Sequence, residues 1–247
     1  MRIIGIDLAW GEFKGDGVCL IEADADSRHA RVTRVLHLYG DAALLGWLDE
    51  CVPPPDTPAM LLFDAPLICP NATGSRPVDR MTHTLFGRFH AGAHPANAGR
   101  CPRPLRLAAA LQTRGYVIGW DLSRSTRLAV EVFPHPAMVR LLGLSRIVKY
   151  KRGPVVARRA EFTRLQGLLR ACVHGSFPEL RMTPELEELL QAAWTKPAED
   201  RLDAFVCALV GWHHWQHAGC RSEVIGDLEA GFILLPAVEV VPVSASA

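Results

Sequence analysis

The sequence lacks several features that assign a protein to a class at once. Its 247 residues contain no apolar run close to the ~18 residues of a membrane-spanning helix. The apolar start of the chain meets Asp7 too early for a secretory signal. The seven cysteines include no CxxC pair, so the sequence indicates no disulfide framework. These absences predict a cytoplasmic protein without a membrane segment.

Net charge is also nearly absent. The chain carries 27 Lys+Arg against 26 Asp+Glu, a formal charge of +1, which excludes a uniformly basic coat and an acidic tail. Hydrophobic residues make up 49% of the chain, too many for an intrinsically disordered protein. The glycines at positions 11, 15 and 17 spell neither a P-loop nor a dinucleotide-binding fingerprint.

Hydrophobic patterning predicts an α/β protein in which three strands precede a helix and a buried strand. The predicted strands are 2–9, 17–23, 31–38, 59–64 and 127–133, with short terminal strands at 224–226 and 231–235. The predicted helices are 41–50, 105–115, 136–143, 155–173, 184–194 and 199–217.

The spacing of these elements predicts a single domain over residues 1–247 with two additions. A long loop rich in Pro, Gly and Arg covers about 65–104, with a short helix near 78–86. A loop of this length inside a compact domain is usually functional or mobile. A helical insertion covers about 136–195.

Carboxylates stand where a core-building sequence disfavours them. Asp7 ends the first apolar strand and Asp64 ends the buried strand, so parallel neighbours would bring the two side chains ~5 Å apart. Asp200 and Asp203 share one face of the last helix, and Glu131 lies inside an apolar strand. Together these residues are candidates for a catalytic site.

Several carboxylates this close need a counter-charge. Mg²⁺ or Mn²⁺ supplies it, and two such ions ~4 Å apart support phosphodiester hydrolysis. Asp7, Asp64, Asp200 and Asp203 are therefore the predicted metal ligands. Each acid also has a structural explanation: a hydrogen bond to a turn, an Asx turn, a helix start, or, for Glu131, an arginine partner.

Basic residues gather in two segments. Residues 71–106 contain six arginines against one acid, and residues 146–164 contain seven basic residues against one acid. Such patches suit a phosphate-bearing ligand, although solvated helix faces also carry charge. The predicted phosphate contacts are Arg76, Arg80, Lys149 and Lys151.

Histidines add weaker candidates. His135 follows the predicted strand 127–133 and is either a proton-transfer residue or a capping group. His90, His94, Cys69 and Cys101 fall in or near the long loop, but their spacing matches no zinc template.

The chain resembles the family of predicted RNase H-like nucleases of bacteria and archaea. The resemblance rests on GIDLAW at 5–10, FDAP at 63–66, EVFPH at 131–135, the Lys149-Tyr150-Lys151 step and EDRLDAFVCAL at 199–209. It implies a ribonuclease H-like fold, in which helices flank a five-stranded mixed sheet whose first three strands are antiparallel.

The resemblance also implies where metal-binding acids lie: on strand 1, at the end of strand 4 and on the last helix. Asp7, Asp64 and the pair Asp200 and Asp203 match these places. The carboxylate that ribonuclease H carries on its first helix has no counterpart here, since 49–50 fall near the far end of that helix.

The expected function is therefore a Mg²⁺- or Mn²⁺-dependent nuclease acting on nucleic acid, with Glu131 assisting. An actin- or sugar-kinase-like phosphotransferase or ATPase is an alternative, although Trp10, Glu12 and Phe13 crowd the turn that would approach a phosphate. A non-catalytic nucleic-acid or protein-binding module is another. The sequence leaves open DNA, RNA or a small nucleotide, the mode of cleavage, one or two metals, and the oligomeric state.

Overall fold

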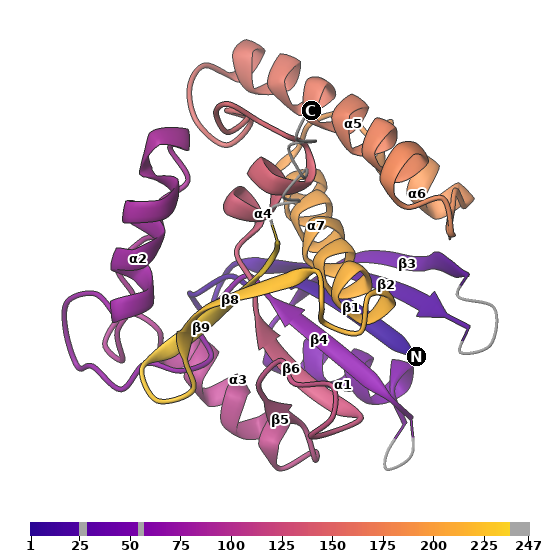
Figure 1. The fold of residues 1–247 in the computed structure, drawn as a ribbon. Helices are drawn as coiled ribbons and strands as arrows, with labels where there is room; N and C mark the ends of the chain where they lie inside the picture. The colour runs from indigo at the N-terminus through magenta and orange to yellow at the C-terminus, as the bar shows by residue number, and fades with distance from the viewer. Residues whose placement is uncertain (25–28, 54–56, 238–247) are drawn as a thin grey trace, which may run out of the picture.

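The computed structural model describes residues 1–24, 29–53 and 57–237 and has an α/β fold (Figure 1). A mixed sheet runs in the order β5-β6-β4-β1-β2-β3-β7. Its strands are β1 (Arg2–Asp7), β2 (Gly15–Ala23), β3 (Ala30–Tyr39), β4 (Ala59–Phe63), β5 (Val117–Ile118), β6 (Arg127–Glu131) and β7 (Leu180–Arg181). An antiparallel ribbon is made of β8 (Ser222–Asp227) and β9 (Gly231–Pro236).

The sheet is antiparallel on one side and parallel on the other. β1 pairs antiparallel with β2, and β2 with β3, whereas β4 joins β1 in parallel and β6 joins β4 in parallel. The predicted sheet had five strands, and the structure has seven. The additions, β5 and β7, are two-residue strands at the two edges, too short for an alternating pattern to reveal them.

Helices flank both faces of the sheet. They are α1 (Asp41–Cys51), α2 (Pro77–Phe86), α3 (Pro102–Gln112), α4 (Pro134–Leu141), α5 (Val155–Ser176), α6 (Pro184–Leu189) and α7 (Lys196–Gln216), with a 3-10 turn, η1 (Gly87–Phe89), after α2. Side chains of β1 and β4 alternate between two cores, because successive residues of a strand point to opposite faces. Ile3 and Met60 pack with α7, while Ile4 and Leu61 pack with α1 and α3.

Two glycines let α7 lie directly on the sheet. A Cβ at Gly5 in β1 would overlap the backbone carbonyl of Ala204, and one at Gly17 in β2 would overlap the backbone of Asp200. Glycine is therefore required where strand and helix backbones approach this closely. This contact fixes the height of α7 over β1 and so places the acids of the helix near the end of that strand.

The segment 65–104 contains more structure than a loop. It holds α2, η1 and the start of α3, and α2 packs against the β8–β9 ribbon (Figure 1). α2 begins with Pro77, and the Asp79 carboxylate accepts hydrogen bonds of 2.9 Å from the backbone N–H groups of both Arg76 and Ala96. Asp79 thereby connects the start of α2 to Ala96, which lies 17 residues further along the chain.

The segment 136–195 contains most of α4, all of α5 and α6, and the edge strand β7. A stretch without helix or strand, residues 142–154, connects α4 to α5. In the part of the chain that the structure describes, no helix combines the length and hydropathy needed to cross a bilayer.

Candidate functional site

Two acids lie side by side where β1 and β4 end. Asp7 is the last residue of β1, and Asp64 follows β4 directly. The strands are parallel neighbours in which Ile6 is opposite Phe63, and the Asp64 backbone N–H donates to the Ile6 carbonyl at 2.9 Å. Since parallel strands end at the same edge of a sheet, both carboxylates meet there.

Asp203 reaches the same place from α7, but protein groups occupy its carboxylate. The side chain is fully buried. The Tyr150 hydroxyl donates to Oδ1 at 2.5 Å, and the Lys151 ammonium lies 2.5 Å from Oδ2. The contact between Lys151 and Oδ2 is an ion pair and does not have the geometry of a hydrogen bond. Both oxygens of Asp203 are therefore engaged by two consecutive residues of the 142–154 stretch.

Asp200 has partners of its own one helical turn earlier. His37 Nε2 lies 3.1 Å from one carboxylate oxygen, and the Lys196 ammonium lies 2.5 Å from the other. Asp200 lies close enough to Asp7 to raise its pKa. The carboxylate of Asp200, however, contacts His37 in β3 and Lys196 at the start of α7.

The open acids carry strongly shifted pKa values. Burial raises the pKa of Asp64 to about 7, and repulsion from Asp203 and Glu131 adds to the effect. Burial likewise raises the pKa of Asp7 well above its usual value, helped by repulsion from Asp203 and Asp64. Lys151 works in the opposite direction on both acids. The ionised pair is therefore short of positive charge.

Lys151 remains charged in this surrounding. Burial alone would lower its pKa, but the nearby Asp203, Tyr150, Asp7 and Asp64 outweigh burial and hold the pKa well above the ordinary value of a lysine. Lys151 is predicted as a phosphate contact; its ammonium lies 2.5 Å from Asp203 and its side chain lines the cavity.

Glu131 and Arg76 form a buried pair beside the acids. The two terminal nitrogens of Arg76 donate to the two oxygens of Glu131 at 2.8 and 2.6 Å, and the Leu67 backbone N–H adds a bond of 3.1 Å. The same guanidinium also donates to Asp79. Arg76 is only 2% exposed, so its N–H groups form hydrogen bonds within the protein. The pair forms part of the wall of the site. Arg76 is the arginine partner that would explain Glu131 as a structural residue.

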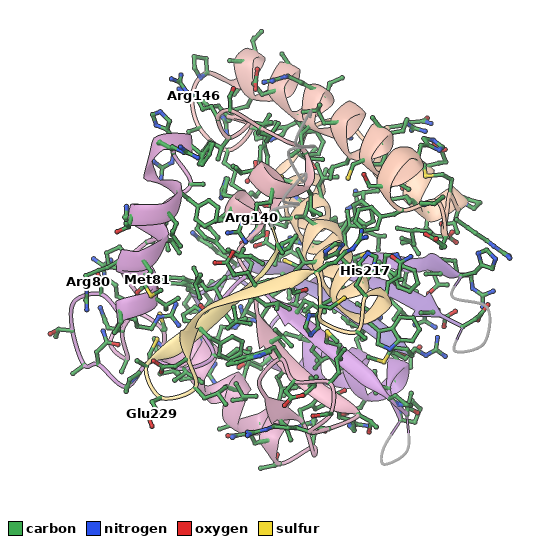
Figure 2. All side chains as sticks on the ribbon, viewed as in Figure 1. Arg80, Met81, Arg140, Arg146, His217 and Glu229 are labelled. Carbon is green, nitrogen blue, oxygen red and sulfur yellow. The ribbon has the colours of Figure 1, made fainter. Side chains whose placement is uncertain are left out.

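The other predicted phosphate contacts lie in different places. Lys149 is exposed and lines the cavity described below. Arg80 donates to the Ser75 carbonyl at 2.6 Å and lies on α2 at the outer edge of the molecule, apart from the acids (Figure 2). Arg80 is therefore not gathered with the other site residues.

A cavity of about 660 Å³ opens in front of Asp7 and Asp64. This volume falls in the range of small-molecule and cofactor sites. As far as the described residues go, its lining includes Asp7, Asp64 and Lys151 but neither Asp200 nor Asp203. Its basic and imidazole side chains, as far as the described residues go, come from α2 and η1 with the chain next to them, from α4 and from the 142–154 stretch. They are Arg76, His83, His90, His94, His135, Lys149, Lys151 and Arg152.

The cavity is acidic at its floor and basic at its walls. Arg152 Nη2 lies 3.3 Å from His94 Nε2, and this contact joins the 142–154 stretch to the loop after η1. Burial, together with the charges of Lys151 and Arg152, lowers the pKa of His135 to about 3. His135 is therefore a neutral imidazole at physiological pH.

The donors present fit a hard divalent cation held by two carboxylates. Asp7 and Asp64 face the cavity, and neither carboxylate has a hydrogen-bond or ion-pair partner among the described residues. Mg²⁺ commonly binds through one or two carboxylates and keeps several waters. The predicted cage of four acids is not assembled: the described residues hold no group of three or more His, Cys, Asp and Glu side chains arranged for a metal ion.

Sequence reasoning missed the residues that hold the acids in place. Asp79 had a local signal, because an acid three residues after Arg76 and next to Pro77 is typical of a helix start. The pairing of Tyr150 with Asp203 joins residues 53 positions apart, so no local spacing indicates it.

Comparison with known proteins gives one match. No curated protein matches the chain significantly, and no solved structure does. The model of one family, described as "Protein of unknown function (DUF429)", matches residues 5–229, which include every acid of the site. Since that match covers most of the sequence, the chain belongs to the DUF429 family.

Proposed function

We propose that this chain is a phosphodiester hydrolase, a nuclease that acts on nucleic acid and depends on Mg²⁺ or Mn²⁺. The observation that carries the proposal is the state of Asp7 and Asp64. They lie on adjacent strand ends, face a cavity without a protein partner, and have pKa values raised by burial and repulsion. A hard cation is the ligand that relieves this shortage of positive charge.

The strand arrangement supports a ribonuclease H-like interpretation. Without the two edge strands, the order is β6-β4-β1-β2-β3, with antiparallel pairing from β1 to β3 and parallel pairing from β1 to β6. This pairing is compatible with the ribonuclease H-like sheet that the sequence resemblance implies, and acids stand at the ends of β1 and β4. Because one fold serves many reactions, the proposal depends on the site.

Asp7 and Asp64 would hold the cation, with water completing its coordination. When bound, such a cation lowers the pKa of a coordinated water and offsets charge on the phosphoryl group. Lys149 and Arg152 offer positive charge to a phosphodiester in the cavity. His135, being neutral, offers a hydrogen-bonding imidazole and not a fixed charge.

The turn after β1 favours hydrolysis over the phosphotransferase alternative. Trp10, three residues after Asp7, lines the cavity. Its indole takes up space where a phosphotransferase would bring backbone amides close to the phosphates of a nucleotide, as glycine-rich turns do. An aromatic side chain at that point instead offers a surface on which a base can stack.

The Asp7→Asn variant tests the proposal. We expect the wild-type chain to cleave labelled DNA or RNA with Mg²⁺ or Mn²⁺ and not with chelator. The variant should lose at least about a hundredfold of the rate, the order that one charge-stabilising group contributes. Asp121→Asn, on an exposed turn, is the matched control and should keep the rate.

Circular dichroism of both variants shows whether either change disturbs the fold. Undiminished cleavage by Asp7→Asn, or cleavage in chelator, would contradict the proposal. A folded wild-type chain that binds nucleic acid, binds no Mn²⁺ and cleaves none of the labelled substrates would favour the non-catalytic alternative.

A further inference from the structure

The charges at the floor of the cavity do not balance. Asp7, Asp64 and Asp203 bring three carboxylates to one place, and Lys151 brings a single ammonium. Asp200 belongs to a separate ion pair with Lys196. When all three acids are ionised, the cluster has a net charge of minus two, which one divalent cation neutralises and two would exceed.

We infer that the Lys151 ammonium is the built-in second cation of this site, so that the protein binds one divalent cation, between Asp7 and Asp64, and not two. This inference rests on the proposed function and fixes what the sequence leaves open, the number of cations. It assigns Asp203 to holding Lys151 and not to ligating metal.

The commitment of Asp203 is the first support. Its oxygens contact the Tyr150 hydroxyl and the Lys151 ammonium at 2.5 Å each, and its side chain is absent from the described lining of the cavity. To become a metal ligand, Asp203 would have to give up a buried hydrogen bond and a buried ion pair. Breaking such a pair would leave an uncompensated charge in the protein interior.

The anchoring of Lys151 is the second support. The preceding Tyr150 is fully buried. Its ring centroid lies 6.4 Å from that of Phe162 in α5 and 6.1 Å from that of His135 in α4. The lysine therefore extends from a fixed backbone position. Its side chain is about one-quarter exposed and lines the cavity together with Asp7 and Asp64. It can thus present its charge both to the acids and to a bound phosphate.

Mn²⁺ binding to the full-length protein tests this inference without relying on activity. Isothermal titration calorimetry gives the stoichiometry and affinity, and electron paramagnetic resonance of Mn²⁺ distinguishes one ion from a coupled pair. We expect one Mn²⁺ per wild-type chain. Asp203→Asn should still bind one Mn²⁺, because the acid is not a ligand, but about tenfold more weakly, because a negative charge near the cation is lost.

Removing the ammonium should strengthen Mn²⁺ binding. Lys151→Met keeps much of the length of the side chain and removes a positive charge a few ångströms from the cation, so we expect at least about tenfold tighter binding. Lys14→Met, on the exposed turn between β1 and β2, is the matched control and should leave the affinity unchanged. Where Lys151→Met does not fold, the wild-type stoichiometry and the Asp203→Asn variant decide.

The failures of the two proposals are distinguishable. Two Mn²⁺ ions per wild-type chain, a coupled pair in the resonance spectrum, or loss of Mn²⁺ in Asp203→Asn would overturn the inference about Lys151 and leave the nuclease proposal standing. Unchanged or weaker binding by folded Lys151→Met would also overturn it. A wild-type chain that binds no Mn²⁺ and shows no Asp7-dependent cleavage would overturn the proposed function itself.

Discussion

The ionised form of a buried carboxylate is stabilised by a neighbouring cation or hydrogen-bond donor, and the acids of this site differ in whether they have one. Asp203 contacts Tyr150 and Lys151, and Glu131 accepts hydrogen bonds from both terminal nitrogens of Arg76. Asp7 and Asp64, which lack such partners among the described residues, line the cavity. Burial raises the pKa of Asp64 to about 7, and no hydrogen-bond donor of the described residues contacts its carboxylate to offset the effect.

His135 gives a residue-scale prediction about acid stability. Burial lowers its folded pKa to about 3, with Lys151, Arg152 and His94 adding to the effect, against about 6.5 in an unfolded chain. Between these values the unfolded chain binds the extra proton, so this contribution to stability is lost as pH falls from about 6.5 toward 3. His135→Gln should remove that loss.

Urea unfolding at pH 7.5 and pH 4.5 measures the effect. The wild-type free energy of unfolding should decrease more between these pH values than that of His135→Gln. Carboxylates titrate in both proteins, so they cancel in the comparison. An equal decrease in the two proteins would show that His135 is not held neutral in the folded chain.

At the scale of elements, the site depends on the contact between α7 and β1. Gly5→Ala places a methyl group against the Ala204 carbonyl, which is backbone and cannot rotate away. We expect the variant to be less stable by about 1–3 kcal/mol, the usual range for overpacking. The free energy of unfolding in urea at pH 7.5 measures it.

Gly46→Ala is the matched control for this change, because Gly46 is exposed in α1 and a Cβ there meets nothing within 4 Å. An exposed helical glycine destabilises a helix relative to alanine, so this variant should be more stable by about 0.5–1 kcal/mol. A shift of both variants in the same direction would contradict the close approach of α7 to β1.

The elements that carry the acids were predictable because their signals are local. The run from Arg2 to Asp7 and the run from Ala59 to Phe63 are apolar and end at acids, which predicts buried strands with polar ends. β5 and β7 were missed, since two residues carry no period. α2 was predicted near 78–86 and spans Pro77–Phe86.

At the scale of the whole molecule, the cavity has opposite charges at its floor and walls. Strand ends supply the acidic floor. Among the described lining residues, the exposed Lys149 and Arg152 come from the basic segment 146–164, whereas Arg76, the lining arginine of segment 71–106, is buried and paired with Glu131 and Asp79. The molecule thus holds positive charge where a phosphodiester would lie over its acids.

The site was less predictable than the fold because its decisive contacts join distant segments. Composition and spacing brought out Asp7, Asp64 and Asp203, but not that Tyr150 and Lys151 would take both oxygens of Asp203. Such pairings follow from the packing of the 142–154 stretch against α7, which no local pattern records.

The central claim is that Asp7 and Asp64 together hold a divalent cation. The most direct measurement is the anomalous scattering of a crystal soaked with Mn²⁺. We expect one anomalous peak within coordination distance of both carboxylates, with the Lys151 ammonium still against Asp203. A crystal with ordered Asp7 and Asp64 and no peak between them would contradict it.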